Sequence, residues 1–468
     1  MQSKEPGEAG AADAPPGPPV LPARARFGFA IGDFGFNLYW QGLGLFLIYF
    51  QTDVLGLPAT WAGACYLAAS LWDGMTDPIV GALADRTRSR WGRYRPFLLF
   101  GSVPLALAFA LLFSAPALPL RWLAAYSLLA QMLVRALYTA LAIPYSSLSA
   151  VITSDSDART RLTGLRMQCA FLGGIAVSYL MPALALALGG PQDGGYARAA
   201  LLIGLLATTA FLVCFACVRE PPATARPATA ALLSEAWVFL GVVRRSRPLL
   251  RLMLGKILLV FALTMHTRNT VYYFKYVLGV LDEARYAMPL LTTASFLSVP
   301  CWVWFIRRTS KRAAWLAACA ATALFAVGLQ WPAHPTVPLA LFLLAAVAAS
   351  TTAFAVCFWA MLPDTIEFNQ WRFGRRDEAK VFGIASFTQK LAMGLSAMAG
   401  GLLLDANGFA ANRDQAPAAL DAIRLTMGLV PAAGALLSGL VMRGYTLDGA
   451  EHRRILHELD ARGELPPR

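Results

Sequence analysis

Two aspartates stand four residues apart in a segment that is otherwise apolar. Asp73 and Asp77 occur in WAGACYLAASLWDGMTDPIVGALA, where the spacing places them on one face of a helix. An ionised carboxylate at the centre of a bilayer costs about 2.5–3.5 kcal/mol, and two like charges on one face add repulsion. The pair therefore indicates either a structural ion pair with a neighbouring helix or a site for a coupling cation, and we favour the cation site.

The same region can supply further oxygen ligands. Thr76 lies three residues after Asp73, and Thr139 lies in a later apolar segment that can pack beside it. Hard cations are bound by several oxygen atoms at short range, so Asp73, Asp77, Thr76 and Thr139 are the candidate cation ligands. This set suits Na+, whereas H+ needs only one carboxylate with a raised pKa, and the sequence leaves both ions open.

The rest of the chain has the composition of an integral membrane protein. Of its 468 residues, 57% are hydrophobic and 14% are charged, whereas soluble domains average about 25% charged. A membrane-spanning helix needs about 20 mostly apolar residues, and we predict an all-α protein with twelve such helices in two six-helix bundles, the layout of the major facilitator fold. The predicted spans are residues 27–52, 60–83, 96–117, 122–150, 163–189, 198–218, 248–277, 285–306, 313–332, 337–362, 380–404 and 421–443.

Polar segments divide the chain into five regions. Residues 1–26 are rich in Pro, Gly and Ala, which is typical of a disordered tail and not of a cleaved signal peptide. A longer polar connection at 219–247 separates the first bundle, 27–218, from the second, 248–445. Residues 446–468 form a C-terminal tail.

The net charge of +13 is distributed unevenly between the loops. Arginine and lysine gather in alternate loops, for example 86–95, 307–312 and 372–376, whereas opposite loops carry single cations such as Arg121. Positive residues concentrate in the cytoplasmic loops of membrane proteins. We therefore expect a multi-pass protein of the cytoplasmic (inner) membrane with both termini in the cytoplasm, and the alternative of a nucleic-acid-binding surface fits this alternation poorly.

Polar side chains at mid-depth in several spans are the candidate substrate ligands. Arginine offers a rigid fork of donors that suits a carboxylate or sugar hydroxyls, and Trp40 can stack on the apolar face of a sugar. The deep cations can instead pair with the aspartates as a structural network, and both roles are compatible if the pairs exchange during transport. The candidates are Asp33, Asn37, Trp40, Arg135, Tyr138, Arg268, Asn269, Gln389 and Lys390.

Two polar segments combine acidic residues with arginines. GALADRTRSRWGRYRP follows the second predicted span, and PDTIEFNQWRFGRRDE follows the tenth. Salt bridges between such groups can hold one side of a carrier closed, so we predict a cytoplasmic gate; the alternative is that these charges only set the topology. The gate candidates are Asp85, Arg86, Arg90, Arg93, Asp364, Glu367 and Arg375.

Longer motifs resemble one transporter family across residues 27–445. GDFGFNLYWQ, FQTDVLGL, LWDGMTDPIVGALADRTRSRWGRYRPFLLFG, LYTALAIPYSSL, YYFKYVLG and VFGIASFTQKLAMG together look like the glycoside–pentoside–hexuronide:cation symporters, whose best-known branch is the melibiose permeases. The resemblance implies that Asp73 and Asp77 bind the coupling cation. It also implies that Thr76 and Thr139 contribute to that site.

The chain departs from the melibiose permeases at their sugar-binding positions. Asn37 and Ala142 stand where that branch has aspartates, Ser146 stands in place of a tryptophan, and Lys390 lies one turn before the position of a helix 11 lysine. The resemblance therefore does not extend to galactoside recognition. Arg135 is an unusual deep cation, and we hypothesise that it marks a different ligand such as an acidic sugar.

We therefore expect a secondary active transporter that moves a sugar or glycoside with Na+ or H+ by alternating access. The alternative is a lysolipid or other amphiphile transporter of the same fold. We do not expect an enzyme, because the sequence has only four histidines and no recognisable metal-ligand cluster or Ser/His/Asp set. The expected partners are a small-molecule substrate, a monovalent cation and membrane lipids, with no cofactor, no nucleic acid and a monomeric state.

Overall fold

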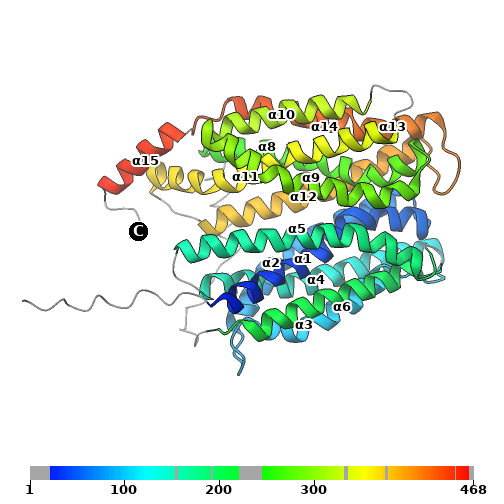
Figure 1. Cartoon of the computed structure of the whole chain (residues 1–468), viewed down its shortest axis with the longest axis horizontal. Coiled ribbons are helices and arrows are strands. Elements are labelled where there is room, and N and C mark those ends of the chain that lie inside the picture. The colour runs from blue at the N-terminus through cyan, green and yellow to red at the C-terminus, as the bar shows by residue number, and fades with distance from the viewer. Residues whose placement is uncertain are drawn as a thin grey trace, which may run out of the picture.

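The protein is helical throughout the part of the chain that the structure describes. The computed structural model describes residues 22–152, 156–190, 193–220, 245–330, 336–374, 378–447 and 449–462. These residues contain no β-strand, which confirms the prediction of an all-α protein. Long helices run side by side in two groups, one stacked on the other (Figure 1).

The first group contains the N-terminal helices, and the first of them continues into a short π-helical turn called η1. Helices α1, α5 and α6 pack on one another, and α3 packs on α4 and α6. The bounds are α1 (Ala23–Tyr49), η1 (Phe50–Val54), α2 (Ala59–Arg86), α3 (Arg95–Leu112), α4 (Leu120–Ile152), α5 (Ser156–Ala187) and α6 (Gly195–Cys217).

The second group begins after the connection at 219–247, most of which lies outside the described residues. In this group α9 packs on α11, and α14 packs on α8 and α10. The bounds are α8 (Arg247–Tyr272), the π-helical turn η2 (Tyr273–Val277), α9 (Leu281–Arg308), α10 (Lys311–Gly328), α11 (Val337–Phe373), α12 (Glu378–Ala406), α13 (Pro417–Met427), α14 (Leu429–Arg443) and α15 (Gly449–Ala461).

The helices have the length and composition expected for a membrane. Within the described residues, eight helical segments are long and apolar enough to span a bilayer, with α13 and α14 counted together. Helices α1, α2, α10 and α12 are not among these eight. Three of them, α1, α2 and α12, contain the ionisable site residues Asp33, Asp73, Asp77 and Lys390, and ionisable side chains lower the mean hydropathy of a segment.

The two groups meet most closely where α2 crosses α12, and α5 also packs on α9. Glycines permit the close approach of α2 and α12: a Cβ at Gly63 would collide with the carbonyl oxygen of Ala397, and a Cβ at Gly401 would collide with that of Ala59. Small residues let membrane helices approach in this way. The contact brings polar side chains of α2 within reach of α12.

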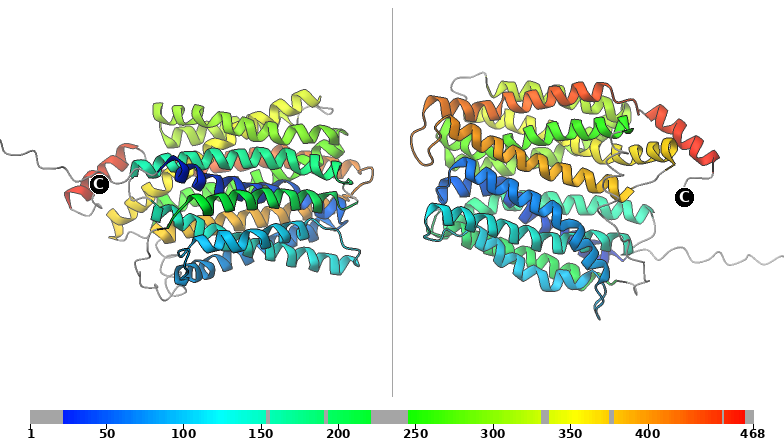
Figure 2. Two further views of the ribbon diagram at one scale, coloured as in Figure 1. Left: turned by 60° about the horizontal axis from the view of Figure 1, so that its bottom comes forward. Right: turned by 180° about the vertical axis from the view of Figure 1, so that it is seen from behind.

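The bundle has two distinct ends. We call the end where α1 begins and α15 lies the terminal side, and the opposite end, where η1 and η2 lie, the far side (Figures 1 and 2). On the far side Asp405 of α12 accepts hydrogen bonds from the backbone N–H groups of Ala59 (3.1 Å) and Thr60 (2.8 Å). A carboxylate is favourable at a helix N-terminus, so Asp405 fastens the start of α2 to the second group.

The turns η1 and η2 end their helices in the same way. Leu55 N–H bonds to Phe50 O (2.9 Å) after η1, and Leu278 N–H bonds to Tyr273 O (3.0 Å) after η2. In both cases the next residue is a glycine with positive φ, Gly56 at 72° and Gly279 at 70°, a conformation that side chains disfavour. The two groups therefore present equivalent turns to each other on the far side.

Candidate functional site

The two aspartates of α2 lie between cations from two other helices. Arg135 of α4 contacts Asp73 with an Nη1–Oδ2 distance of 3.2 Å. Lys390 of α12 lies 3.1 Å from Asp73 Oδ2 and 2.5 Å from Asp77 Oδ2. Lys390 therefore bridges both carboxylates and ties the second group of helices to the first.

Thr139 joins the two carboxylates from α4. Its hydroxyl oxygen lies 2.9 Å from Asp73 Oδ1 and 3.1 Å from Asp77 Oδ1. The hydroxyl of Thr76 instead donates to the backbone carbonyl of Asp73 (3.1 Å), three residues earlier in the same helix. The Thr139 hydroxyl thus contacts both carboxylates, whereas the Thr76 hydroxyl proton is donated to a backbone carbonyl of α2.

The electrostatics of this cluster are balanced. The two carboxylates face two side-chain cations, and the Asp73 and Arg135 side chains are almost fully buried. Buried charges are stable only when they are paired and hydrogen-bonded. An incoming cation would therefore compete with Lys390 and Arg135 for carboxylate oxygens that these residues hold in this conformation.

A second ion pair lies within the first group of helices. Asp33 of α1 accepts hydrogen bonds from Arg166 Nε of α5 (2.5 Å) and from the Tyr145 hydroxyl of α4 (2.7 Å). Asn37 donates to the backbone carbonyl of Asp33 (2.9 Å). Arg166 was not among the predicted site residues, and it neutralises Asp33 in this structure.

Two adjoining cavities lie where the two groups face each other. One has a volume of about 280 Å³ and lies between α1, α5, α8, α9 and α11; the other has about 250 Å³ and lies between α1, α8 and α12. Both are bordered by Gln41 of α1 and Thr267 of α8. The polar residues of the first also include His266, Thr270, Thr292, Ser295 and Thr351, and those of the second include Trp40, Thr264, Arg268 and Gln389.

The cavities contain only some of the predicted substrate residues. Trp40, Arg268 and Gln389 line the smaller cavity. The Tyr138 ring lies 6.2 Å from the Trp40 ring, and Asn269 is buried. Gln41 was not included in the predicted substrate set, although it follows Trp40 directly in the motif GDFGFNLYWQ. The hydroxyl residues of α8 and α9 were missed, because a lone Thr or Ser in an apolar helix commonly bonds to its own backbone.

Arg268 differs from the other cations near the cavities. Its side chain projects from α8, and the guanidinium carbon lies 3.6 Å from the centroid of the Tyr66 ring. Arg135 approaches the same ring at 4.6 Å. No nitrogen of the Arg268 guanidinium has a hydrogen-bond partner in the described part of the chain.

The predicted gate residues are dispersed on the terminal side. Arg90 lies over the Trp91 ring at 4.0 Å, and the backbone N–H of Arg93 donates to Glu220 (2.9 Å). Arg375 and the side chains of Asp85 and Arg86 lie outside the described residues. The interaction of the first-group residues with those of the second therefore stays a prediction.

Asp364 and Glu367 form contacts within the second group. Lys311 of α10 donates to Asp364 Oδ2 (2.7 Å), and His452 of α15 shares a short hydrogen bond with Glu367. His452 also lies 3.8 Å from Asp364. The hydrogen bond to Glu367 is the main reason why the pKa of His452 is raised above its ordinary value.

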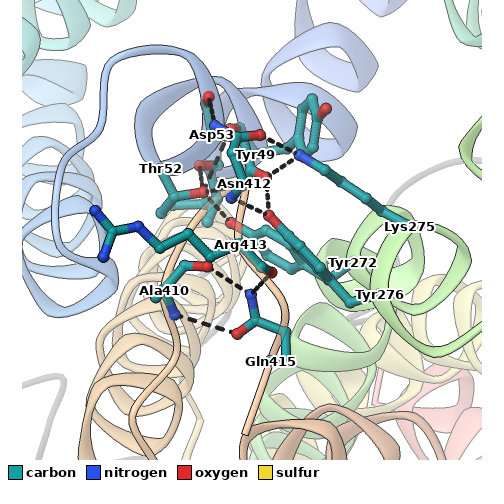
Figure 3. A network of polar contacts seen from close by, with 11 residues as sticks. Tyr49, Thr52, Asp53, Tyr272, Lys275, Tyr276, Ala410, Asn412, Arg413 and Gln415 are labelled. Carbon is teal, nitrogen blue, oxygen red and sulfur yellow. Dashed lines mark hydrogen bonds and ion pairs between the residues drawn. The ribbon is translucent and has the colours of Figure 1, made fainter. Parts of the chain in front are cut away.

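A polar network on the far side joins η1 to η2 (Figure 3). Lys275 of η2 donates to Asp53 Oδ1 of η1 (2.5 Å), and the Tyr276 hydroxyl donates to the same oxygen. The hydroxyls of Thr52 and Tyr272 form a further contact between the groups at 2.5 Å. This network was not predicted, although its residues occur in the motifs FQTDVLGL and YYFKYVLG.

Asn412 completes this network from the loop between α12 and α13. Its side-chain oxygen accepts from Lys275 (2.6 Å), its side-chain nitrogen donates to the carbonyl of Asp53 (2.6 Å), and its backbone N–H donates to Tyr276 (2.9 Å). Its φ of 58° is left-handed, a conformation that asparagine tolerates better than most residues. Asn412 therefore contacts both groups at once (Figure 3).

Two helical groups around a central cavity with polar side chains in its lining, joined to each other by ion pairs, define a membrane transporter of the major facilitator type. The family model described as MFS/sugar transport protein matches residues 28–449. The chain belongs to this family, which confirms the predicted superfamily and excludes an enzyme as the class of protein.

Curated relatives cover almost the whole chain. The uncharacterized symporter YnaJ of Bacillus subtilis is 29% identical over 94% of this chain and 95% of its own length. The isoprimeverose transporter of Lactiplantibacillus pentosus is 27% identical over 93% and 91%. The glucuronide carrier protein homolog of Escherichia coli is 26% identical over 94% and 96%.

Solved structures agree on the fold. The nucleoside transporter NupG has a TM-score of 0.63 and 14% identity, covering 91% of this chain and all of that chain (100%). A bacterial homolog of the lysosomal transporter Spinster, in an inward-facing conformation, has a TM-score of 0.63 and 13% identity, covering 95% and 99%. At these identities the likeness establishes the major facilitator fold and not the substrate.

Proposed function

We propose that this protein is a symporter that carries a sugar or glycoside together with Na+ or H+ by alternating access. The observation that carries the proposal is the bridge from Lys390 of α12 to Asp73 and Asp77 of α2. The carboxylate pair lies where α2 meets α12 of the other group of helices, which is a position from which a bound coupling ion could control their contact. The names of the relatives, which include an isoprimeverose transporter and a glucuronide carrier homolog, support a sugar as the cargo.

The cation site consists of Asp73, Asp77 and Thr139, with Thr76 as a further ligand. Arg135 and Asp73 belong to the same group of helices, so their pair can persist when the groups move. Lys390 belongs to the other group, and a cation that binds the carboxylates displaces it. Binding of the coupling ion therefore breaks a tie between α2 and α12, and this links ion occupancy to movement of the groups.

The substrate binds in the paired cavities. Gln41, Thr267 and Gln389 offer hydrogen bonds to sugar hydroxyls, and Trp40 offers an aromatic face. A lysolipid carrier of the same fold would need an apolar cleft for its acyl chain. The hydroxyl, amide and guanidinium groups of the cavity favour a sugar over that alternative.

The terminal side faces the cytoplasm in this proposal. The loops rich in arginine and lysine alternate along the chain with loops that carry single cations, and by this alternation they fall on the same side as both termini. Positive loops face the cytoplasm in membrane proteins. The network of Asp53, Lys275 and Asn412 then closes the external side. One chain contains both groups and the cavity between them, so a monomer surrounded by lipid suffices for transport. Asp364 and Glu367 remain candidates for the cytoplasmic gate when the groups approach on that side.

Uptake into membrane vesicles tests this function. A panel of labelled neutral and acidic glycosides is offered under an inward Na+ gradient, an inward H+ gradient or no gradient. We expect one gradient to drive accumulation of at least one glycoside, and we expect Asp77→Asn to abolish that accumulation. Uptake that is equal under all gradients would contradict coupling.

The matched control is Lys256→Met. Lys256 is a buried cation of α8 that lies over the Phe358 ring at 3.5 Å and lines neither cavity. Its substitution removes a cation from the same helix as Arg268 without touching the carboxylate pair. Accumulation driven by the ion gradient is expected to survive in this variant.

A further inference from the structure

Arg268 carries a charge for which the described part of the protein supplies no counterion. Its side chain is only 4% exposed and lines the smaller cavity. None of its three guanidinium nitrogens has a hydrogen-bond partner among the described residues. Leaving a buried charge unpaired costs several kcal/mol, so an arginine held in this way is suited to a counterion that arrives with the ligand.

The other ionised groups near the cavity are already paired. Asp73 and Asp77 are held by Arg135 and Lys390. The groups that act electrostatically on Arg268 are the Tyr66 phenol and the like-charged Arg135, and no carboxylate is among them. This region therefore contains two carboxylates, Asp73 and Asp77, and three cations, Arg135, Lys390 and Arg268. Arg268 is the cation that neither carboxylate neutralises.

The contact with Tyr66 does not neutralise Arg268, because a phenol is not a counterion. The guanidinium carbon lies over the Tyr66 ring, 3.6 Å from its centroid, which is within the range of a cation–π contact. The N–H groups lie in the plane of the guanidinium, where they match the two oxygens of a carboxylate or a sulfonate. Tyr66 is thus a neighbour of this guanidinium, and it is a phenol and not a carboxylate.

We infer that the transported sugar is a monoanion whose carboxylate or sulfonate binds Arg268, while its hydroxyls face Gln41, Thr267 and Gln389. This inference rests on the proposed function and names its substrate class. The sequence hypothesis had assigned an acidic sugar to Arg135. In the structure Arg135 is bound to Asp73, whereas Arg268 lines the smaller cavity and has no carboxylate partner among the described residues.

Binding to the purified full-length protein in lipid nanodiscs tests this inference without any ion gradient. The probes are pairs of methyl glycosides that differ only at C6, namely glucuronide against glucoside and galacturonide against galactoside, with the 6-sulfonate of each sugar as a second anion. Calorimetry gives the dissociation constants. We expect the wild type to bind at least one anion about tenfold or more tightly than its neutral partner, since hydrogen bonds to charged groups contribute about 1.5–3 kcal/mol.

Two variants locate the effect. Arg268→Gln should weaken anion binding about 10- to 100-fold and remove the preference over the neutral partner. Arg268→Lys keeps the charge but loses the fork, so it should retain part of the preference. Lys256→Met is the control. Lys256 is another buried cation that lacks a hydrogen-bond partner in the described chain, but it lines neither cavity. This variant should prefer the anionic glycoside over its neutral partner as strongly as the wild type does.

The outcomes separate this inference from the proposed function. If a neutral glycoside accumulates under a cation gradient and no anion binds better than its neutral partner, the anionic class is wrong and symport stands. An anion preference that survives in Arg268→Gln would also overturn the role of Arg268. If anions bind through Arg268 but no gradient drives their uptake, the anion site stands and symport falls. If Arg268→Gln does not fold, the wild-type comparison of anion with neutral partner decides alone.

Discussion

Asp73 and Asp77 lie one helical turn apart, but their surroundings differ. The Asp73 side chain is 4% exposed and contacts Arg135, Lys390 and Thr139, whereas the Asp77 side chain is 29% exposed. A buried ion pair that loses one partner leaves an uncompensated charge, whereas a partly exposed group can be solvated. Asp73 is therefore expected to stabilise the helices as well as bind the ion, and Asp77 to act mainly in ion binding.

Asparagine substitutions distinguish the two roles. Asp73→Asn should lower the free energy of unfolding by about 3–5 kcal/mol, because Arg135 loses its carboxylate, whereas Asp77→Asn should lower it by about 1 kcal/mol or less. Unfolding of the purified proteins in denaturant measures both. Asp421→Asn is the control, because the Asp421 side chain is 73% exposed and its loss should not alter stability.

Equal destabilisation by Asp73→Asn and Asp77→Asn would contradict this division. Both variants should nevertheless lose ion-driven accumulation, since each removes a ligand of the coupling ion. A stable Asp77→Asn protein without accumulation is the outcome that best separates transport from folding.

The sequence identified the carboxylate pair because an ionised residue in an apolar segment demands an explanation. It did not assign the cations to their partners, since Arg135 and Lys390 reach Asp73 from helices 62 and 317 positions away. Only the packing of α2 against α4 and α12 selects those pairs and leaves Arg268 without one. The chemistry was therefore predictable, and the pairing required the structure.

The paired turns η1 and η2 are the elements that join the groups on the far side. Each ends a long helix with a five-residue π-helical turn, a leucine and a positive-φ glycine. Asp53 of one turn and Lys275 of the other form the ion pair between them, and Asn412 bridges both. A gate built from equivalent ends of the two groups opens when those groups separate.

Removing the Asn412 side chain should loosen this gate. Asn412→Gly keeps the left-handed backbone and the N–H that bonds to Tyr276, but loses the contacts to Asp53 and Lys275. We expect faster hydrogen exchange in residues 50–57 and 273–280, measured by mass spectrometry. Asn407→Gly is the control, because among the contacts described the Asn407 side chain bonds only to Leu403, in the last turn of the helix that ends just before it. Unchanged exchange in Asn412→Gly would show that the Asn412 side chain does not hold the gate.

Docking of α15 on α11 should depend on pH. The pKa of His452 is raised by Glu367 and also by Asp364, while Lys311 opposes them. A raised pKa means that docking is fully stabilised below the ordinary histidine value of about 6.5 and weakens as the pH rises through the raised value. The protection factor of residues 449–461, which is the intrinsic exchange rate at each pH divided by the measured rate, should fall as the pH rises across this range.

His452→Gln should remove most of this dependence. The glutamine retains a hydrogen-bonding side chain but does not titrate, so any remaining change with pH must come from other groups. Trp371 still donates to Glu458 of α15 (2.6 Å) in this variant, which keeps the helix docked. A pH profile identical to that of the wild type would exclude His452 as the source.

The sequence predicted where the helices lie along the chain but not how each helix ends. Long apolar stretches predicted the membrane helices, and the chain follows the predicted order. The break between α13 and α14 at Gly428 and the turns η1 and η2 were not predicted. Hydropathy reports burial in lipid and contains little information on whether a helix ends in an α or a π turn.

The whole molecule is held at its centre by charges that belong to different halves. Lys390 reaches from α12 to α2, and Lys275 reaches from η2 to η1. The bundle boundaries at 27–218 and 248–445 stay a prediction, and residues 1–21, most of the connection at 219–247 and residues 463–468 lie outside the described residues. The ties between halves are few and polar, which suits a protein whose halves must exchange partners during each cycle.

The unmatched charge of Arg268 has a consequence for the energy source of transport. If one monovalent cation accompanies one monoanionic sugar, the loaded carrier moves no net charge, and the membrane voltage, worth about 2.3 kcal/mol per charge at 100 mV, contributes nothing to accumulation. A potassium diffusion potential imposed with valinomycin should leave uptake of the anionic glycoside unchanged, whereas the chemical gradient of the coupling ion should drive it. A strong response to voltage would mean that extra cations travel with each sugar; an electrically silent carrier would keep working in a cell whose membrane potential has collapsed.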